Sequence, residues 1–349
     1  MNNTEFPTPF LADFGIARGH GTPNRQEFIT QPRSTMNPIS FPRREFVRRM
    51  MTASLTAGAF ASVARRSGAA ENPRLHLSTN SYSWHVFYQR EGRDFGAGLD
   101  AGLAEVKSCG IDGFEPGVGG VDDVRNLIPF LKKNGLEMRS LYVNSTLHTE
   151  ADAATSIENI VAVAKETRSV GTRIFVTNPN PIQWGGAQNK DDGQLRIQAA
   201  SMNKLGAALK EHGVTLAYHN HDIELRNAGR EFHHMMLGTD PGLVSLCLDS
   251  HWVFRGSGNS QVALFDVVKL YGSRVVELHL RQSQAGIWSE TLDAGDIDHE
   301  RLAAELRKAG AKPHCVLEVA VEKGTPKTMS TAEAHRRSAA YARQVFGAM

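Results

Sequence analysis

The sequence predicts a single (β/α)8 TIM barrel that follows an N-terminal export signal. From residue 74 onward, apolar strand-like runs and amphipathic helix-like segments alternate eight times with no linker between them. The number of units and the length of this region match a TIM barrel. A doubly wound open sheet would need a glycine-rich phosphate loop after its first strand, and residues 79–84 (TNSYSW) contain no glycine. We therefore expect one barrel domain over residues 71–349.

Each of the eight units pairs an apolar run with a helical pattern. The predicted strands are 75–79, 112–116, 137–143, 173–177, 214–219, 243–249, 274–280 and 314–319. The predicted helices are 101–108, 121–133, 153–169, 194–212, 232–237, 260–271, 298–308 and 332–346. Several of these helical patterns stop at a glycine, which suits the left-handed cap of a helix: Gly110, Gly135, Gly171, Gly213, Gly272 and Gly310.

Residues 36–70 have the features of an export signal. The arginine pair Arg43 and Arg44 precedes a weakly apolar stretch that is rich in alanine and glycine and ends in small residues. This pattern resembles a twin-arginine (Tat) signal peptide, which implies a periplasmic or otherwise exported protein. The apolar stretch is too short and too weakly apolar for a membrane span. We expect Met36 to be the true start, so residues 1–35 would be disordered or untranslated.

Charge and cysteine content argue against two classes of protein. The whole chain has a formal net charge of +2, and residues 1–70 contain nine arginines and four acidic residues, so the remainder carries −3. A nucleic-acid-binding protein needs a basic face, so we expect no nucleic-acid partner. Cys109, Cys247 and Cys315 show no CxxC spacing, which argues against a disulfide framework and a thiolate zinc site. Cys247 and Cys315 lie in apolar runs and are predicted core residues.

The strand predicted at 214–219 leads into two histidines. His219 and His221 lie two residues apart in the run YHNHDIE, so they project to the same face of the strand while Asn220 turns away. Two neighbouring imidazoles at the end of a strand are poor core material and good metal ligands. In a TIM barrel this end of each strand forms the active-site face. The spacing therefore predicts a metal site at the barrel mouth.

Three later strands end in the same way. Each places polar or aromatic residues at its C-terminal end: Asp249, His251 and Trp252 after the sixth strand, His279 and Arg281 at the seventh, and Glu318 at the eighth. The C-terminal ends of all eight strands of a TIM barrel meet at one mouth. Residues that are distant in the sequence can therefore share one ion there.

These motifs resemble those of the xylose isomerase-like superfamily, the sugar phosphate isomerase/epimerase proteins. The resemblance covers roughly residues 74–345 and rests on YHNHDIE, LDSHWVFRG, ELHLRQ and VLEV at strands five to eight, and on GDIDHERLAAELRKAG at the helix predicted over 298–308. Members of this family typically bind one divalent metal through residues on those four strands. The ligands that the resemblance implies are His219, Asp249, His279 and Glu318.

The implied donor set differs from that of many family epimerases, which carry glutamate on the fifth strand. This chain has His219 and His221 there, and it has Arg281 and Gln282 where many relatives read His-x-Lys-Asp. The two-glutamate mechanism of the epimerases is therefore not carried over, and His221 is an alternate ligand. Two carboxylates with one or two imidazoles suit Mn²⁺, Co²⁺, Zn²⁺ or Mg²⁺, and the nitrogen donors favour Mn²⁺ or Zn²⁺.

Such an ion would bind a sugar carbonyl and stabilise the enediolate that forms when a neighbouring C–H proton is removed. A carboxylate or a neutral histidine must take this proton. The candidate catalytic residues are Glu318, His221 and Glu115. The candidate substrate-binding residues are Glu115, Asn144, His251, Trp252 and Arg281.

We therefore expect a metal-dependent sugar isomerase or epimerase that acts through an enediolate on a sugar or keto-sugar. A sugar dehydratase or lyase, of the inosose dehydratase or keto-glycoside eliminase type, would use the same site. Two further alternatives are a nuclease of the AP endonuclease type and a non-catalytic carbohydrate-binding barrel. The acidic body argues against the first, and the complete ligand set argues against the second. The expected partner is a small-molecule sugar, and the barrel could form a homo-oligomer.

Overall fold

The computed structural model describes residues 74–349 of the chain. The export signal expected at 36–70 and the segment 1–35 lie outside the described residues. Within residues 74–349, none of the helices combines the length and the apolarity that a membrane span requires.

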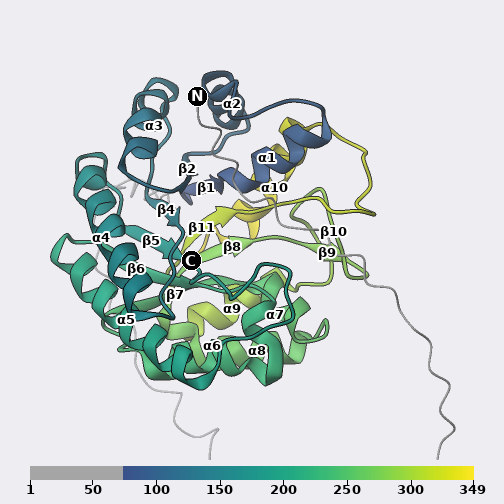
Figure 1. Cartoon of the computed structure of the whole chain (residues 1–349). Helices are drawn as coiled ribbons and strands as arrows, with labels where there is room; N and C mark the ends of the chain where they lie inside the picture. Colours follow the sequence, from purple (N-terminus) through teal and green to yellow (C-terminus); the bar gives the residue numbers. More distant parts are fainter. Residues whose placement is uncertain (1–73) are drawn as a thin grey trace, which may run out of the picture. The chain divides into compact units, whose positions relative to one another are not determined.

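Nine strands form the main sheet in the described part of the chain. They are β1 Leu77–Asn80, β2 Gly113–Glu115, β3 Gly117–Val118, β4 Ser140–Val143, β5 Ile174–Thr177, β6 Thr215–His219, β7 Val244–Asp249, β8 Val275–Leu280 and β11 His314–Leu317. Their order in the sheet is β2-β1-β11-β8-β7-β6-β5-β4-β3, and all neighbours are parallel. The sheet lies at the centre with the helices around it (Figure 1). This arrangement confirms the predicted TIM barrel.

The second strand of the barrel is divided at Pro116. The part before it, β2, pairs with β1, and the part after it, β3, pairs with β4. Proline has no backbone N–H to donate, which interrupts the ladder. The N–H of Phe114 nevertheless donates to the carbonyl oxygen of Glu137 at 2.8 Å. Gly113 permits a close approach here, because a Cβ atom would lie 2.4 Å from Oγ of Ser78. The continuous segment 113–118 thus supplies both end strands of the sheet, β2 and β3.

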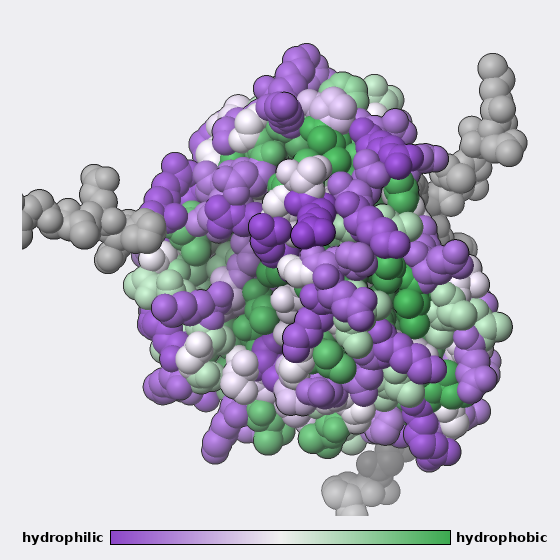
Figure 2. Space-filling view, turned by 90° about the vertical axis from the view of Figure 1, so that its left-hand side faces the viewer, coloured by the Kyte–Doolittle hydropathy of each residue, from purple (hydrophilic) through white to green (hydrophobic). Residues whose placement is uncertain are grey.

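Helices follow the strands and cover the outside of the sheet (Figure 1). They are α1 Ser81–Arg90, α2 Leu99–Ser108, α3 Val121–Asn134, α4 Glu150–Thr167, α5 Asp192–Glu211, α6 Arg226–Gly238, α7 Ser250–Gly256, α8 Gln261–Tyr271, α9 His299–Lys308 and α10 Thr331–Phe346. Figure 2 shows a mostly hydrophilic outer face with hydrophobic side chains in small groups. Helices that bury one apolar face against a sheet produce such a surface.

The two faces of the sheet pack against different apolar clusters. Side chains on the outer face, such as Leu216 and Leu246, belong to the large core under the helices. Because strand residues alternate between faces, Ala217 and Cys247 point into the barrel, where they form a small cluster with Val176. Ala217 and Cys247 lie two residues before His219 and Asp249 on their strands, so this apolar layer lies directly below those polar side chains of the mouth.

Two helices and one hairpin were not predicted. α1 begins inside the segment 79–84, where Oδ1 of Asn80 accepts the N–H of Ser83 at 3.4 Å and caps the helix. α7 follows β7 directly, because Oδ1 of Asp249 accepts the N–H of Trp252 at 2.9 Å. The antiparallel hairpin of β9 Ser283–Gln284 and β10 Ile287–Trp288 follows β8. α7 and the two hairpin strands are short, so hydrophobic periodicity gives a weak signal for them.

The predicted helix 232–237 covers only the C-terminal half of α6. Residues 227–229 have left-handed backbone conformations inside that element, so no regular helical pattern precedes residue 232. The other predicted helices and strands differ from the structure only at their ends, where residue-level boundaries are least defined.

Candidate metal centre and active site

Parallel pairing brings the predicted ligands to one level of the barrel. Asp249 in β7 is the register partner of His279 in β8, which in turn pairs with Val316, two residues before Glu318. His219 is the last residue of β6. All four predicted ligands are buried, with at most 6% of each residue exposed. The strand ends therefore place these groups together inside the mouth.

His219, Asp249 and Glu318 form one candidate metal-binding group. Each offers one ligand atom, and these atoms all lie within 4.8 Å of one another. His279 joins the group through Glu318, because its Nδ1 lies 2.6 Å from Oε2 of that carboxylate. A ring nitrogen and a carboxylate oxygen this close need a proton or a cation between them. The structure thus brings the four predicted ligands together.

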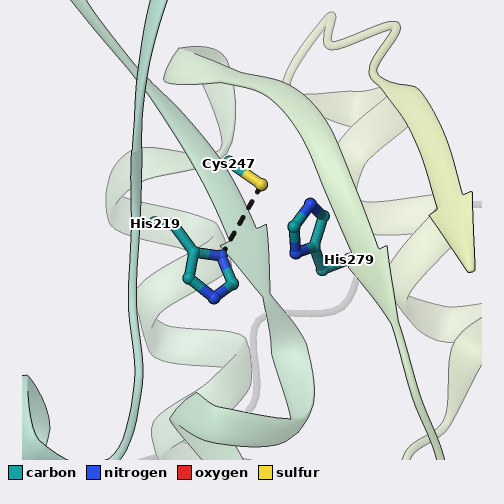
Figure 3. Close-up of side chains that lie close together, drawn as sticks. All are labelled: His219, Cys247 and His279. Carbon is teal, nitrogen blue, oxygen red and sulfur yellow. Dashed lines mark hydrogen bonds between the residues drawn. The ribbon is translucent and has the colours of Figure 1, made fainter. Parts of the chain in front are cut away.

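Cys247 lies next to two of these ligands, His219 and His279, as Figure 3 shows. Its Sγ is 3.7 Å from Nδ1 of His219 (dashed line), and the three side chains form a second candidate donor group. The sequence pattern predicted a core residue, and Cys247 does belong to the apolar layer inside the barrel. Its spacing of two residues from Asp249 was the available signal that it lies on the same face as the ligands.

A buried guanidinium holds two of the carboxylates. Nη2 of Arg281 lies 2.7 Å from Oε1 of Glu318 and 3.4 Å from Oδ2 of Asp249. The guanidinium carbon lies 5.0 Å from the ring centre of Trp252 and 4.5 Å from that of Trp288, where aromatic faces attract cations. Arg281 was expected to contact substrate. In the structure it is engaged by the ligand carboxylates.

Glu115 contacts the other nitrogen of the His279 ring. Its Oε1 lies 3.0 Å from Nε2 of His279. Oε2 accepts a hydrogen bond from Oγ of Ser140 at 2.9 Å, and Oε1 accepts one from Nδ2 of Asn80 at 3.4 Å. Oε1 of Glu277 lies 3.4 Å from the same ring nitrogen. Both oxygens of Glu115, expected from the sequence to act on the sugar, are therefore occupied by protein groups.

The pKa values of the histidines at the mouth are shifted in different directions. Burial, together with the charge of His279, lowers the pKa of His219 well below its usual value. Burial also lowers the pKa of His221 to about 4. Both rings are thus neutral at pH 7 and have a free lone pair for a metal or a proton. For His279, burial acts in the same direction, but the neighbouring groups, led by Cys247 and Glu115, raise its pKa well above the usual value.

The carboxyl groups differ as well. Burial raises the pKa of Asp249 to about 6 and that of Glu277 to about 8. Burial would also raise the pKa of Glu318, but the charges of Arg281 and His279 outweigh it and hold that pKa far below its usual range. Glu318 is therefore ionised at neutral pH, which is the state that binds a metal.

The comparison with known families decides what kind of barrel this is. Residues 103–344 match the family model described as xylose isomerase-like TIM barrel. The chain belongs to this family. Proteins of the family commonly bind divalent metal ions, and the solved structure of a xylose isomerase-like TIM barrel protein from Mycobacterium smegmatis is a complex with magnesium. That protein is 13% identical to this chain, with a TM-score of 0.59 and coverage of 79% of this chain and 97% of the other.

Two further relatives are similar to this xylose isomerase-like barrel. An inosose dehydratase from Clostridium perfringens is 27% identical over 190 residues, which are 51% of this chain and 62% of that protein. The match thus spans less than two thirds of the curated relative. The crystal structure of a sugar phosphate isomerase/epimerase from Parabacteroides distasonis has a TM-score of 0.62 at 17% identity. It covers 81% of this chain and 98% of the other, and it supports the fold.

The donor set of this xylose isomerase-like barrel fits a divalent metal ion. Two imidazole nitrogens and two carboxylate oxygens converge in a buried position, a combination that suits transition metals. The close approach of His279 to Glu318 also places two donor atoms where one cation could contact both. His219, Asp249, His279 and Glu318 are the residues that would hold the ion.

A cavity opens beyond the ends of β4 and β5. Its volume is ≈ 410 Å³, and its lining includes Asn144, His148 and Trp184. The ring centre of Trp184 lies 5.2 Å from that of His221, which lies 4.7 Å from that of His219. Asn144, an expected substrate contact, therefore lines a cavity that is linked to the candidate metal centre through the rings of Trp184 and His221.

The two expected substrate contacts after β7 occupy different surroundings. Trp252 is half-buried, and its ring centre lies 5.6 Å from that of His221, so it borders the mouth. His251 is fully buried, with its ring centre 6.2 Å from that of Trp288. Burial lowers the pKa of His251 to about 2, and neither ring nitrogen has a hydrogen-bond partner. The structure thus brings Trp252 to the mouth and packs His251 among aromatic rings.

Two asparagines that support the ligands were not found from the sequence. Nδ2 of Asn178 donates to the carbonyl oxygen of His219 at 2.9 Å. Nδ2 of Asn220 donates to the carbonyl oxygen of Asp249 at 3.1 Å and ties the end of β6 to the end of β7. Strand alternation predicts that Asn220 turns away from the histidines, but no sequence spacing reveals its partner on the next strand.

Proposed function

We propose that this protein is a metal-dependent sugar isomerase or epimerase that acts through an enediolate on a sugar or keto-sugar. The observation that carries this proposal is the donor cluster at the mouth, in which Nδ1 of His279 lies 2.6 Å from Oε2 of Glu318 beside His219 and Asp249. Membership of the xylose isomerase-like family and similarity to a sugar phosphate isomerase/epimerase support sugar chemistry at this site.

A divalent ion held by these four side chains would polarise the carbonyl group of a sugar and make the neighbouring C–H group more acidic. We assign proton transfer to Glu318 and His221. Glu318 is ionised, so it can accept a proton. His221 is neutral, and its ring contacts those of His219 and of Trp184, which lines the cavity. A carboxylate and a neutral imidazole in one mouth suit general acid–base catalysis.

The same proton transfer serves isomerisation and epimerisation. Glu318 removes the proton from the carbon next to the carbonyl group, and the C–H electron pair forms the enediolate. Return of a proton to that carbon from the opposite face gives the epimer. Return of a proton to the former carbonyl carbon, with transfer of the hydroxyl proton, gives the isomer. Neither outcome consumes an oxidant or a second reactant.

A sugar dehydratase is the second candidate function. The similarity to inosose dehydratase favours it, as does the presence of His219 and His221 where many epimerases of the family have a glutamate. In this reaction the enediolate expels the hydroxyl group on the next carbon, and the proton that Glu318 removed, relayed through the neutral imidazole of His221, lets it leave as water. One C–H bond and one C–O bond break, and the product is an enol that becomes a diketone.

The charges around the mouth favour a substrate without phosphate. Arg281 is paired with Glu318, and Arg255 is paired with Glu322 at 2.8 Å through Nη2. A phosphate group usually needs an unpaired guanidinium or a nest of backbone N–H groups. Export of the protein, if the leader acts as proposed, would also separate it from the mainly cytoplasmic phosphosugars.

A substrate screen by NMR tests this function. The metal-loaded protein would be incubated with free sugars, keto-sugars and inososes, and we expect epimer or isomer signals, or the loss of one water from an inosose. His221→Gln should reduce turnover by ~10²-fold or more, because it removes a proton-transfer group. His212→Gln, at the C-terminal end of α5, is the matched control. Full turnover in His221→Gln would contradict the assignment, and the absence of any reaction would contradict the function.

A further inference from the structure

His279 is contacted on both ring nitrogens by carboxylates. Its Nδ1 lies 2.6 Å from Oε2 of Glu318, in the ligand group, and its Nε2 lies 3.0 Å from Oε1 of Glu115. TIM barrels usually fill this part of the interior with branched apolar side chains. A fully buried carboxylate such as Glu115 is costly unless hydrogen bonds compensate it. Its position therefore calls for a specific role.

Other donors fix the orientation of Glu115. Oγ of Ser140, in β4, donates to Oε2 at 2.9 Å, and Nδ2 of Asn80, in β1, reaches Oε1 at 3.4 Å. Together with His279 in β8, three strands supply partners for one carboxylate at the end of β2. The oxygen that faces Nε2 is held in place by these contacts. Glu115 can therefore orient the histidine ring and not merely follow it.

A neutral imidazole has one N–H group, so a strong acceptor at one nitrogen decides which nitrogen keeps its lone pair. Histidines that bind metals usually donate their second N–H to a carboxylate or a carbonyl oxygen. We propose that Glu115 is a positioning residue that accepts the Nε2–H of His279 and thereby leaves Nδ1 as the metal-binding nitrogen. This inference rests on the proposed function, because it concerns a ligand of that metal centre.

Glu277 is the other carboxylate near Nε2, and the geometry separates the two. Its Oε1 lies 3.4 Å from the ring nitrogen, compared with 3.0 Å for Glu115, and it also accepts a contact from Sγ of Cys247 at 3.6 Å. The shorter distance and the two supporting donors assign the main interaction to Glu115. Glu277 is as deeply buried, so it provides a matched control.

Zinc affinity of the metal-stripped full chain, measured by calorimetry, tests this role. Glu115→Leu should bind zinc about 10- to 100-fold more weakly, the usual effect of losing such an outer partner. Glu115→Gln should stay within about three-fold of the wild type, because its carbonyl oxygen can still accept the Nε2–H. Glu277→Gln should change affinity little. Wild-type affinity in Glu115→Leu, or equal losses in Glu115→Leu and Glu115→Gln, would overturn the proposal.

Nitrogen NMR on the zinc-loaded wild type provides a second test, in which a variant serves only to assign the signals. With ¹⁵N-labelled histidine, assigned by comparison with His279→Gln, we expect a zinc-bound Nδ1 and a protonated Nε2 at His279. A zinc-bound Nε2 would overturn the role of Glu115 and leave the proposed function standing. A wild-type protein that binds no zinc, manganese or cobalt would overturn the proposed function itself, so the two failures are distinguishable.

Discussion

Nη2 of Arg281 lies 2.7 Å from Oε1 of Glu318, and both side chains are buried in the barrel mouth. The same nitrogen is 3.4 Å from Oδ2 of Asp249. In the metal-free protein this guanidinium supplies positive charge to two carboxylates that a metal ion would also neutralise. Arg281 and the ion therefore share one electrostatic role, and the stability of the fold should depend on both.

Arg281→Met tests this relationship. Removal of one partner of a buried ion pair leaves uncompensated charge, so the metal-free variant should lose about 3–5 kcal/mol of unfolding free energy. In saturating manganese the loss should be smaller, because the ion compensates Asp249 and Glu318. Urea unfolding with EDTA and with manganese measures both values.

Arg255→Met is the matched control for this experiment. Arg255 is partly exposed and pairs with Glu322 and the carbonyl oxygen of Gly286 instead of the ligand carboxylates. We expect its effect on unfolding free energy to be small and equal with and without manganese. An Arg281→Met variant that is equally destabilised in both conditions would contradict a shared role with the metal.

The metal ligands are tested by elemental analysis. Asp249→Ala and Glu318→Ala should each lose the bound divalent ion while the circular dichroism spectrum stays that of a folded protein. Each removes one carboxylate from a four-ligand set, so the centre loses both a donor atom and a negative charge. Glu290→Ala, a buried carboxylate that pairs with Arg90, is the control that should retain the ion. Full metal content in both ligand variants would refute the site.

Metal binding should strengthen as the pH rises through the neutral range. The pKa of His279 is raised above its usual value and that of Asp249 is raised to about 6, so the metal-free protein holds protons on these groups in mild acid. Metal binding needs both groups deprotonated and releases those protons. As the pH is lowered, the affinity for the metal should therefore fall by about tenfold per pH unit for each proton that binding releases. Calorimetry below and above neutral pH, in buffers with different ionisation heats, measures this, and equal or tighter binding in acid would contradict it.

Much of the barrel and the ligand positions could be predicted from the sequence. Strand alternation and the convergence of parallel strands place His219, Asp249, His279 and Glu318 at one mouth. These rules use only spacing within one strand and the common direction of all strands. The same rules place Glu277, two residues before His279, on the same inner face of the strand, although Glu277 was not predicted from the sequence as a site residue.

The contacts between side chains of distant strands could not be predicted. Arg281 was expected to face substrate, and its engagement by Glu318 depends on how β8 and β11 pair. Glu115 was expected to contact a sugar, and its contact with His279 crosses the interior from β2 to β8. Such distances depend on the closed barrel, which no local pattern in the sequence encodes.

Export through the leader remains a proposal that cell fractionation can test. Replacement of Arg43 and Arg44 by lysine should keep the protein in the cytoplasm, because the twin-arginine receptor recognises the guanidinium pair and not charge alone. Replacement of Arg48 and Arg49 by lysine is the matched control and should leave export unchanged. Undiminished secretion of the Arg43 and Arg44 variant would show that the leader has another role.

The central claim is that the metal centre assists removal of a proton next to a sugar carbonyl. Hydrogen exchange with D₂O, followed by NMR on a substrate from the screen, tests it most directly. We expect deuterium at the carbon next to the carbonyl group, loss of exchange in EDTA, and recovery with manganese or zinc. Glu318→Gln should slow the exchange by ~10²–10⁴-fold or more, since it removes the base and a ligand. Turnover that continues in EDTA, or that places no deuterium in substrate or product, would contradict the claim.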